Sequence, residues 1–189
     1  MDFSRLCVAA AMVAAIPAGA IAQANGPIAR IAAYDEAVTG VAGAHLGLAA
    51  RADRFEPIVR AYYDMPLIAS LVIGPGWASA SAAEKAAAAT ALARHSAMSL
   101  ARNFNSADGL RFVVDPAPVA RGGSEIVKVT IGGDTLFYRM HQAGGQWRIV
   151  DVISGGVSQL ALQRADLASA AAKGIPALVK RLGEIDAVK

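Results

Sequence analysis

Hydrophobic residues between positions 54 and 74 repeat with the period of an α-helix. In the first stretch they fall at i, i+3, i+4, i+7 and i+8, namely at Phe55, Ile58, Val59, Tyr62 and Tyr63. Asp64 is the predicted N-cap of a second helix. Pro66 suits the first turn of this helix, and Gly74-Pro75 is a typical C-terminal end. The apolar stripe of this helix ends in Leu71-Val72-Ile73, a run that is also compatible with a short buried strand.

A third and longer helix is predicted after Ser81. Ser81 and Glu84 have the spacing of a capping box, and an alanine-rich stretch follows as far as about Phe104. Residues at helical spacing define the stripe that we expect to be buried, made of Ala88, Leu92, Ser96, Ser99 or Leu100, and Phe104.

At Asp108-Gly109 the period of the hydrophobic pattern changes from that of an α-helix to two residues, which is the period of a β-strand. Four runs rich in β-branched and aromatic side chains follow, at residues 110–115, 125–131, 135–141 and 147–153. Gly132-Gly133 and Gly144-Gly145 stand where tight hairpin turns belong, so the last three runs predict an antiparallel meander. We expect one face of this sheet to be apolar and to contain Val127, Val129, Ile131, Leu136, Tyr138, Met140, Val150 and Val152.

Helical periodicity returns after Gly155-Gly156. An apolar stripe from Val157 to Leu167 predicts one helix, Gly174 interrupts it, and a short amphipathic helix begins near Pro176. No internal repeat or linker divides the chain. The order of helices, meander and helices predicts a single α+β domain, with the helices packed on one side of a small antiparallel sheet.

The amino-acid composition excludes two classes of protein, intrinsically disordered proteins and polytopic membrane proteins. Of 189 residues, 55% are hydrophobic and 17% are charged, and the formal net charge is +3. This content excludes intrinsic disorder, which requires few hydrophobic residues and a high net charge. Beyond the N-terminus, charged residues recur too often for an apolar run that spans a bilayer, so a polytopic membrane protein is excluded. The positive charges form no basic block, and we expect no nucleic-acid partner.

Residues 1–22 are predicted to be a secretory signal peptide. They contain an apolar run of 11 residues, which is too short to span a bilayer, and small residues precede a cleavage site after Ala22 or two residues later. Residues 23–189 would form the exported domain. The single cysteine, Cys7, lies in the removed segment, so the mature chain would have neither a disulfide nor a thiolate nucleophile.

The sequence contains no strong catalytic or metal-binding motif. His45, His95 and His141 lack the spacing of metal ligands, and we expect each to be exposed or hydrogen-bonded. Gly122-Gly123-Ser124 precedes a strand, where no strand-to-helix turn would expose the serine as a nucleophile. Gly74-Pro75-Gly76 imitates a dinucleotide-binding turn, but the proline removes a backbone donor and a helix C-cap explains the same residues. We therefore expect no catalytic, metal or cofactor site.

Asp151 is a carboxylate with two chemical interpretations. It follows Ile149-Val150 in a predicted strand, and a carboxylate inside an apolar cavity has a raised pKa that suits a general base. Strand periodicity instead places it on the face opposite Val150 and Val152. On that face we expect it to pair with a cation or to cap a backbone turn.

The region from residue 147 onward resembles the C-terminal part of the MlaC / toluene-tolerance family. The most specific part of the resemblance is Trp147, then Asp151, then Gly156-Val157-Ser158. Upstream, Tyr62-Tyr63-Asp64-Met65-Pro66 and the long helix to Phe104 also resemble this family, in particular its hopanoid-associated HpnM branch. The resemblance covers about residues 55–182.

This resemblance implies a soluble periplasmic carrier that binds a phospholipid or a hopanoid and exchanges it with membrane-anchored components of an ABC-transport system. It also implies an apolar lipid cavity between the helices and the sheet, and we expect the carrier to be a monomer. An acyl chain gains about 0.8 kcal/mol for each methylene removed from water, so a carrier needs a dry cavity and no catalytic groups. From the apolar stripes we predict lipid contacts for Tyr62, Leu67, Leu71, Leu100, Phe104, Phe112, Val127, Val129, Tyr138, Val150 and Val152.

Two other classes of function remain open at this point. A cone-shaped helix-on-sheet enzyme would hold a small apolar substrate in the same kind of cavity, with Asp151 as the base, and Asp151→Asn would abolish turnover. A pure interaction protein would have no cavity and would dock on its partner through exposed arginine and lysine side chains.

Overall fold

The computed structural model describes residues 26–187, so the predicted signal peptide lies outside the described residues. Within them the chain forms an α+β fold with an antiparallel sheet, as predicted. The helices are α2 (Pro27–Ala42), α3 (Leu48–Tyr62), α4 (Met65–Ile73), α5 (Gly76–Ser79), α6 (Ala82–Asn103), α7 (Gln159–Ala171) and α8 (Ile175–Ala187). The strands are β1 (Phe112–Val114), β2 (Val119–Arg121), β3 (Ser124–Ile131), β4 (Asp134–Ala143), β5 (Gln146–Ser154) and β6 (Val157–Ser158).

The sheet is built around the predicted meander. Its strand order is β1-β3-β4-β5-β6, β2 also pairs with β3, and every pair is antiparallel. The hairpin between β3 and β4 turns at Gly132-Gly133, where both residues have positive φ angles of 57° and 101°. Residues with a Cβ rarely adopt such angles, which is why paired glycines predict this turn correctly.

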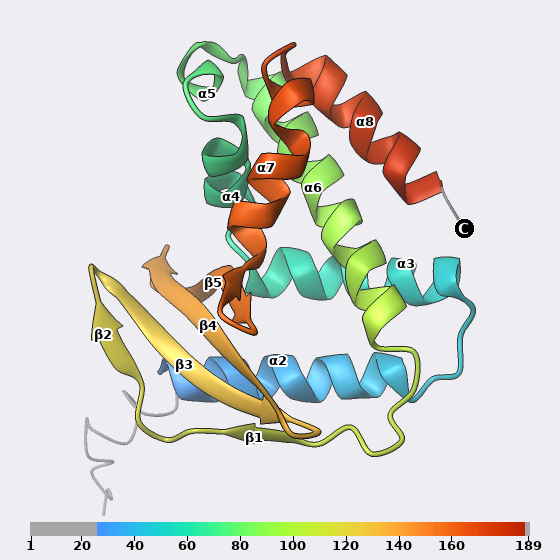
Figure 1. Ribbon diagram of the computed structural model, residues 1–189, viewed down its shortest axis with the longest axis vertical. Coiled ribbons are helices and arrows are strands. Elements are labelled where there is room, and N and C mark those ends of the chain that lie inside the picture. Colours follow the sequence, from blue (N-terminus) through green and yellow to red (C-terminus); the bar gives the residue numbers. More distant parts are fainter. Residues whose placement is uncertain (1–25, 188–189) are drawn as a thin grey trace, which may run out of the picture.

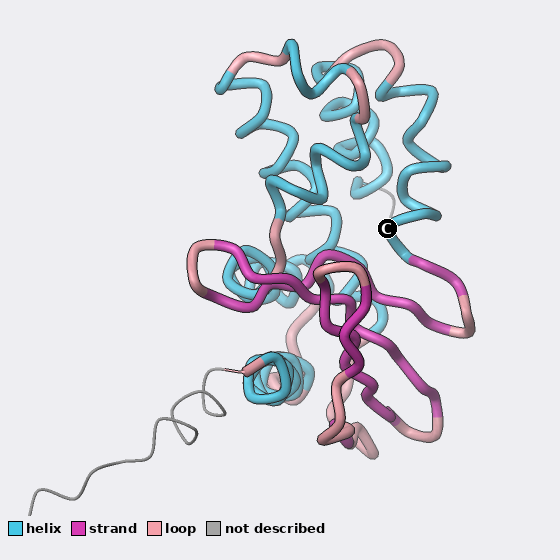
Figure 2. The backbone as a smooth tube through the Cα atoms, turned by 90° about the vertical axis from the view of Figure 1, so that its left-hand side faces the viewer, coloured by secondary structure: helices cyan, strands magenta, loops and turns pink. Residues whose placement is uncertain are grey.

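The helices form a layer against the sheet and extend beyond one end of it. Figure 1 shows α4, α6, α7 and α8 gathered together, while α2 runs alongside the strands, and in Figure 2 α2 is seen almost end-on beside the sheet. Fully buried side chains from both layers form one core, including Phe55, Leu92, Met140, Ile149 and Leu178. None of the helices in the described part of the chain is long and apolar enough to cross a membrane.

Local signals predict several element ends correctly. Asp64 caps α4 by accepting a hydrogen bond at Oδ1 from the Leu67 amide at 3.0 Å, and the capping box of Ser81 and Glu84 is formed in full. The ambiguous run that ends at Ile73 is helical, because it completes α4. The interpretation of this run as a strand is therefore wrong.

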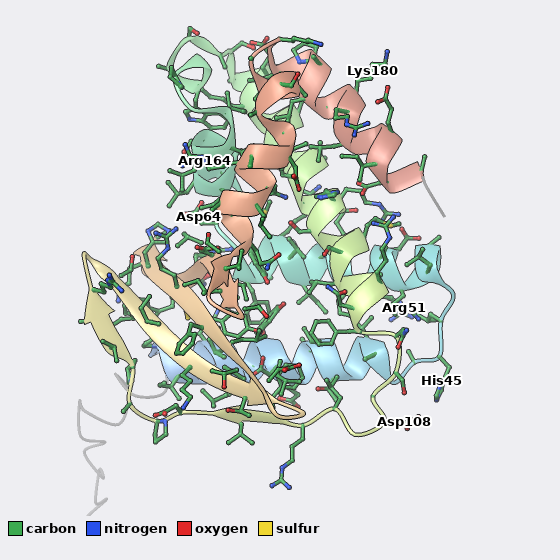
Figure 3. All side chains as sticks on the ribbon, viewed as in Figure 1. His45, Arg51, Asp64, Asp108, Arg164 and Lys180 are labelled. Atoms are coloured by element: carbon green, nitrogen blue, oxygen red, sulfur yellow. The ribbon has the colours of Figure 1, made fainter. Side chains whose placement is uncertain are left out.

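Buried charge also holds the helical layer together. Arg51 of α3 is only 9% exposed, and Figure 3 shows it close to the C-terminal end of α6. Its Nε donates to the Ala101 carbonyl at 2.7 Å and its Nη1 donates to the Leu46 carbonyl at 2.7 Å. Carbonyls near a helix C-terminus lack an intrahelical donor, so one guanidinium satisfies acceptors on two segments.

Other elements differ from the prediction. The pattern does not indicate α2, because its buried residues are interrupted by a charged one, and α3 begins at Leu48, ahead of the predicted start. The strands β2 and β6 are too short to show a period. Val157-Ser158, predicted as the start of a helix, forms β6, and the helix starts at Gln159.

A bulge in β5 changes which residues share the apolar face. Arg139 pairs with Asp151, whereas Met140 pairs with Ile149, so Val150 is an extra residue on its strand. Ile149 is therefore the residue opposite Met140, although the predicted apolar face did not include it. Both Ile149 and Val150 are buried, at 0% and 4% exposure, because residues flanking a bulge do not follow strict alternation.

The buried stripe of α6 is rotated relative to the predicted one. Ala88 and Leu92 are buried as expected. The remaining buried positions are small or flexible residues, namely Ala93, Ala97, Met98 and Ala101, on a helix that packs against α3, α4 and α8. The predicted positions Ser96, Leu100 and Phe104 are instead only partly buried and Ser99 is exposed, and all four border a cavity.

Candidate functional site

A cavity of about 720 Å³ lies between the sheet and the helices, within the size range of small-molecule sites in proteins. Its sheet side is mainly apolar, with Ile131, Leu136, Tyr138, Val150 and Val152, and it also includes the polar residues Asp134, Asp151 and Ser154. The opposite side comes from one face of α6 and one face of α7, with Ile68 from α4 and Ile185 from α8. The hollow is therefore bounded by elements from both layers of the fold.

Three tyrosines form one wall of this cavity. Tyr34 contacts Tyr63 and Tyr138, with ring centroids 5.8 and 5.9 Å apart, and its hydroxyl lies 3.0 Å from that of Tyr63. Burial raises the pKa of Tyr63 to about 12 and raises the pKa values of Tyr34 and Tyr138 well above 10. The three phenols therefore stay neutral at physiological pH, and none of them can act there as a phenolate base.

Polar side chains line the helical side of the cavity. His95, Ser99 and Asn103 follow one another at four-residue intervals on α6, and Ser96 lies beside them. From α7 the facing residues are Gln159, Gln163 and Asp166. This polar wall was not predicted from the sequence, although the four-residue spacing of His95, Ser99 and Asn103 in an alanine-rich helix indicates a polar face.

The structure brings together five of the eleven residues predicted to contact lipid. Leu100, Phe104, Tyr138, Val150 and Val152 all line the cavity. The contact of each with a lipid stays a prediction, because position alone does not test it.

The other six predicted residues do not line the cavity. Val127 and Val129 are fully buried in the core, on a strand that packs against α2. Leu67 and Leu71 belong to α4, which turns Ile68 toward the cavity instead. Tyr62 packs against Tyr34 and beneath the Arg30 guanidinium, and Phe112 packs against Phe104 with ring centroids 6.1 Å apart.

The family-motif residues build the corner where β5, β6 and α7 meet. Asp151 is 7% exposed, and its Oδ1 accepts from the Leu160 amide at 3.0 Å while its Oδ2 accepts from the Ser158 hydroxyl at 2.7 Å. Ser158 in turn caps α7 by accepting from the Ala161 amide at 3.0 Å. Gly156 has a φ of 80° in the preceding turn, Val157 is 46% exposed, and Trp147 packs on the core.

Asp151 therefore fixes the first turn of α7. An Nη2 atom of Arg139 also lies 3.7 Å from its Oδ2, so the carboxylate pairs with a cation and caps a backbone turn, as one of the two interpretations predicts. The predicted position of Asp151 on the face opposite Val150 and Val152 is wrong, because beside the bulge all three residues line the same cavity. Both of its oxygens accept hydrogen bonds from the protein. These hydrogen bonds give Asp151 a structural role at the start of α7, which explains its burial without a substrate.

We expect Asp151→Ala to lower the free energy of unfolding by about 2–3 kcal/mol, because it leaves a buried amide and a hydroxyl without their acceptor. Chemical denaturation at neutral pH measures this loss. Asp166→Ala, an exposed position on the same region of α7, is the matched control and should change stability little. Equal effects of the two substitutions would contradict the proposed capping role.

The histidines occupy separate structural positions. Nε2 of His141 lies 2.8 Å from Oδ2 of Asp64, Nδ1 of His95 lies 2.8 Å from Oδ1 of Asp186, and His45 is exposed. Each is thus exposed or hydrogen-bonded, as predicted. Among residues 26–187 no group of three or more potential ligands could hold a metal ion.

The sequence matches one known protein family. The family described as MlaC protein matches residues 36–184, from within α2 to within α8. The chain belongs to the MlaC family. This match extends upstream of the region in which the sequence alone resembles the family, and it includes the C-terminal part of α2.

One solved structure shares the fold of this MlaC-family chain. It is the phospholipid-binding protein from Ralstonia solanacearum, in complex with a phospholipid, with a TM-score of 0.66 and 18% sequence identity. The match covers 84% of this chain and 96% of that chain. No curated protein matches the sequence.

Proposed function

We propose that this MlaC-family chain is a periplasmic lipid carrier, which takes a phospholipid or a hopanoid into the cavity between sheet and helices and passes it between membrane-anchored ABC-transport components. The observation that carries the proposal is the cavity of about 720 Å³, whose sheet side presents the apolar side chains of Ile131, Leu136, Val150 and Val152. The phospholipid bound to the Ralstonia solanacearum protein of the same fold supports it.

Such a carrier binds and releases a lipid without making or breaking a covalent bond. An acyl chain that leaves water gains about 0.8 kcal/mol per buried methylene, so an apolar wall formed by Leu136, Val150 and Val152 binds the chain in proportion to its length. The polar residues of α6 and α7 would face the less apolar part of the lipid. The small side chains of Ser96 and Ser99 leave room for a wide ligand, which supports a hopanoid as one possible cargo.

Mass spectrometry of the bound lipid tests the proposal. The protein is exported with its own leader, purified from the periplasm and extracted with organic solvent. We expect about one lipid molecule per chain, and the extracted species identifies the cargo. The delipidated protein should take up lipid again from liposomes.

Two results would contradict the carrier. The first is a protein that contains no lipid and takes up none from liposomes of several compositions. The second is a protein retained in the cytoplasm with residues 1–22 still attached, which would remove the periplasmic location. Binding of lipid with no exchange to a second population of liposomes would contradict carriage while leaving binding intact.

A further inference from the structure

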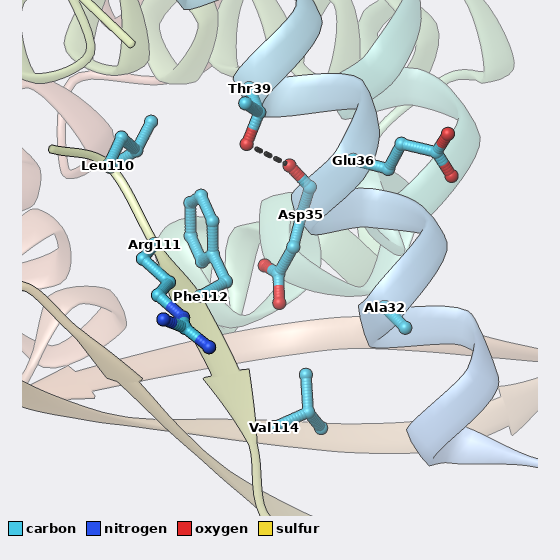
Figure 4. Close-up of a pocket in the computed structure, with 8 residues that line it drawn as sticks. All are labelled: Ala32, Asp35, Glu36, Thr39, Leu110, Arg111, Phe112 and Val114. Carbon is cyan, nitrogen blue, oxygen red and sulfur yellow. Dashed lines mark hydrogen bonds between the residues drawn. The ribbon is translucent and has the colours of Figure 1, made fainter. Parts of the chain in front are cut away.

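A second hollow, which we call the α2–β1 pocket, lies between α2 and the segment that enters β1 (Figure 4). Its volume is about 300 Å³. It is separate from the larger cavity but shares structure with it, because Phe112 lines the pocket, Phe104 lines the cavity, and their rings are in contact. The pocket is lined by Ala32, Asp35, Glu36, Thr39, Leu110, Arg111, Phe112 and Val114.

Asp35 is the unusual residue of this pocket. It is 4% exposed, and neither carboxylate oxygen accepts a hydrogen bond from any residue that the structure describes. Figure 4 shows the carboxylate directed into the space between the helix and the strand. The nearby Thr39 hydroxyl donates to the Asp35 backbone carbonyl at 2.8 Å and leaves the carboxylate unpaired.

An unpaired buried carboxylate is costly to a fold. Buried polar groups almost always have a partner, and a buried charge without one is strongly disfavoured. Desolvation by burial accordingly raises the pKa of Asp35 from 3.8 to about 7. A ligand that brings a positive charge and hydrogen-bond donors would remove this cost.

The other lining residues indicate the type of cation. Within the described residues no set of three potential ligands could hold a metal ion, so a bound metal does not fit the pocket. Half of the lining residues are apolar, and Leu110, Phe112 and Val114 among them suit the carbon atoms of an organic cation. An aromatic ring such as Phe112 also attracts a cation through its face. Glu36 adds a second, exposed carboxylate at the pocket.

We propose that the α2–β1 pocket binds an ammonium group, with the Asp35 carboxylate as its buried partner and Glu36 at the entrance. Arg111 is the basic residue of the pocket, and its exposed guanidinium repels a second positive charge. Removal of this side chain should therefore tighten the binding of an amine, whereas removal of the Asp35 charge should weaken it.

Two sources supply an ammonium group of this kind. One is a small amine in solution. The other is the amine head group of a lipid whose chain occupies the larger cavity, and this second source rests on the proposed function. It is consistent with the structure because Tyr34, next to Asp35 on α2, and Phe104, in contact with Phe112, both line that cavity.

Isothermal titration of the delipidated protein with ethanolamine tests the pocket. We expect the unsubstituted protein to bind ethanolamine, and Asp35→Asn, which keeps the shape of the side chain, to weaken binding by about tenfold or more. Arg111→Ala should strengthen binding. Glu184→Gln, at an exposed position of α8 away from the pocket, should leave it unchanged. Unaltered affinity in Asp35→Asn would overturn the proposal.

Lipid uptake from vesicles separates the two sources. Vesicles of phosphatidylethanolamine and of phosphatidylglycerol with the same acyl chains are compared. Preferential uptake of phosphatidylethanolamine that Asp35→Asn abolishes supports a head-group site. Ethanolamine binding without this preference supports a site for a free amine.

The same comparison distinguishes the failure of this proposal from the failure of the carrier. Equal uptake of both lipids, with no ethanolamine binding, would overturn the ammonium site and leave the carrier standing. Ethanolamine binding by a protein that takes up neither lipid would support the ammonium site and contradict the carrier.

Discussion

Val152→Glu should remove bound lipid from the protein, with a loss of about tenfold or more in the lipid that co-purifies with it. Val152 lies on the apolar sheet side of the cavity, and a carboxylate placed there must either stay charged in an apolar site or take up a proton. Both alternatives disfavour an acyl chain in contact with it. The amount of lipid per chain, measured by mass spectrometry after solvent extraction, gives the result.

Val113→Glu is the matched control for this experiment. It is the same chemical change on a strand of the same sheet, but Val113 is 54% exposed and does not line the cavity. It should leave the lipid content unchanged. If Val152→Glu folds, as judged by its circular dichroism and thermal transition, and still carries a full complement of lipid, the cavity is not the lipid site.

Asp35→Asn should stabilise the delipidated protein in a pH-dependent way. The pKa of Asp35 is about 7 in the folded protein and 3.8 as a free side chain. A group whose pKa is raised on folding favours the folded state while it is protonated, and this contribution is fully present below about pH 4. As the pH rises through about 7 the folded state must hold a buried charge, and stability is lost.

The expected gain from Asp35→Asn is about 2–4 kcal/mol in the free energy of unfolding at pH 8, because each pKa unit corresponds to about 1.4 kcal/mol. The gain should shrink toward zero as the pH approaches 4. Denaturant titrations at several pH values measure both quantities. Glu36→Gln, the exposed neighbour on α2, should show no comparable pH dependence. A constant effect of Asp35→Asn at all pH values would show that its charge is not the cause.

Signals within a few residues predicted the local structure well. The N-cap at Asp64, the capping box at Ser81 and Glu84, and the glycine pairs of the hairpins all act through neighbouring backbone groups. These interactions are nearly independent of the rest of the fold. They therefore identify most helices and the meander, and the arrangement of a helical layer on one side of the sheet follows from their order.

Features that depend on residues distant in the chain were not predicted correctly from the sequence. The helix α2 has a buried Asp35 between the core residues Tyr34 and Val38, which obscures its apolar pattern. The bulge that adds Val150 to β5 depends on pairing with β4 and leaves no mark in a single strand. Nothing in the order of residues indicates that Asp35 would be buried without a partner.

The amino-acid pattern was enough to predict the type and order of most elements and to show a resemblance to the MlaC family, and it contains no recognisable catalytic motif. Which apolar residues border a cavity and which are packed in the core became visible only in the folded arrangement. Val129 and Val152 illustrate the reason, since both are valines at apolar strand positions, yet Val129 is fully buried and Val152 faces the cavity. Periodicity reports which side of an element is turned away from water. Whether another side chain fills the space on that side depends on residues distant in the chain.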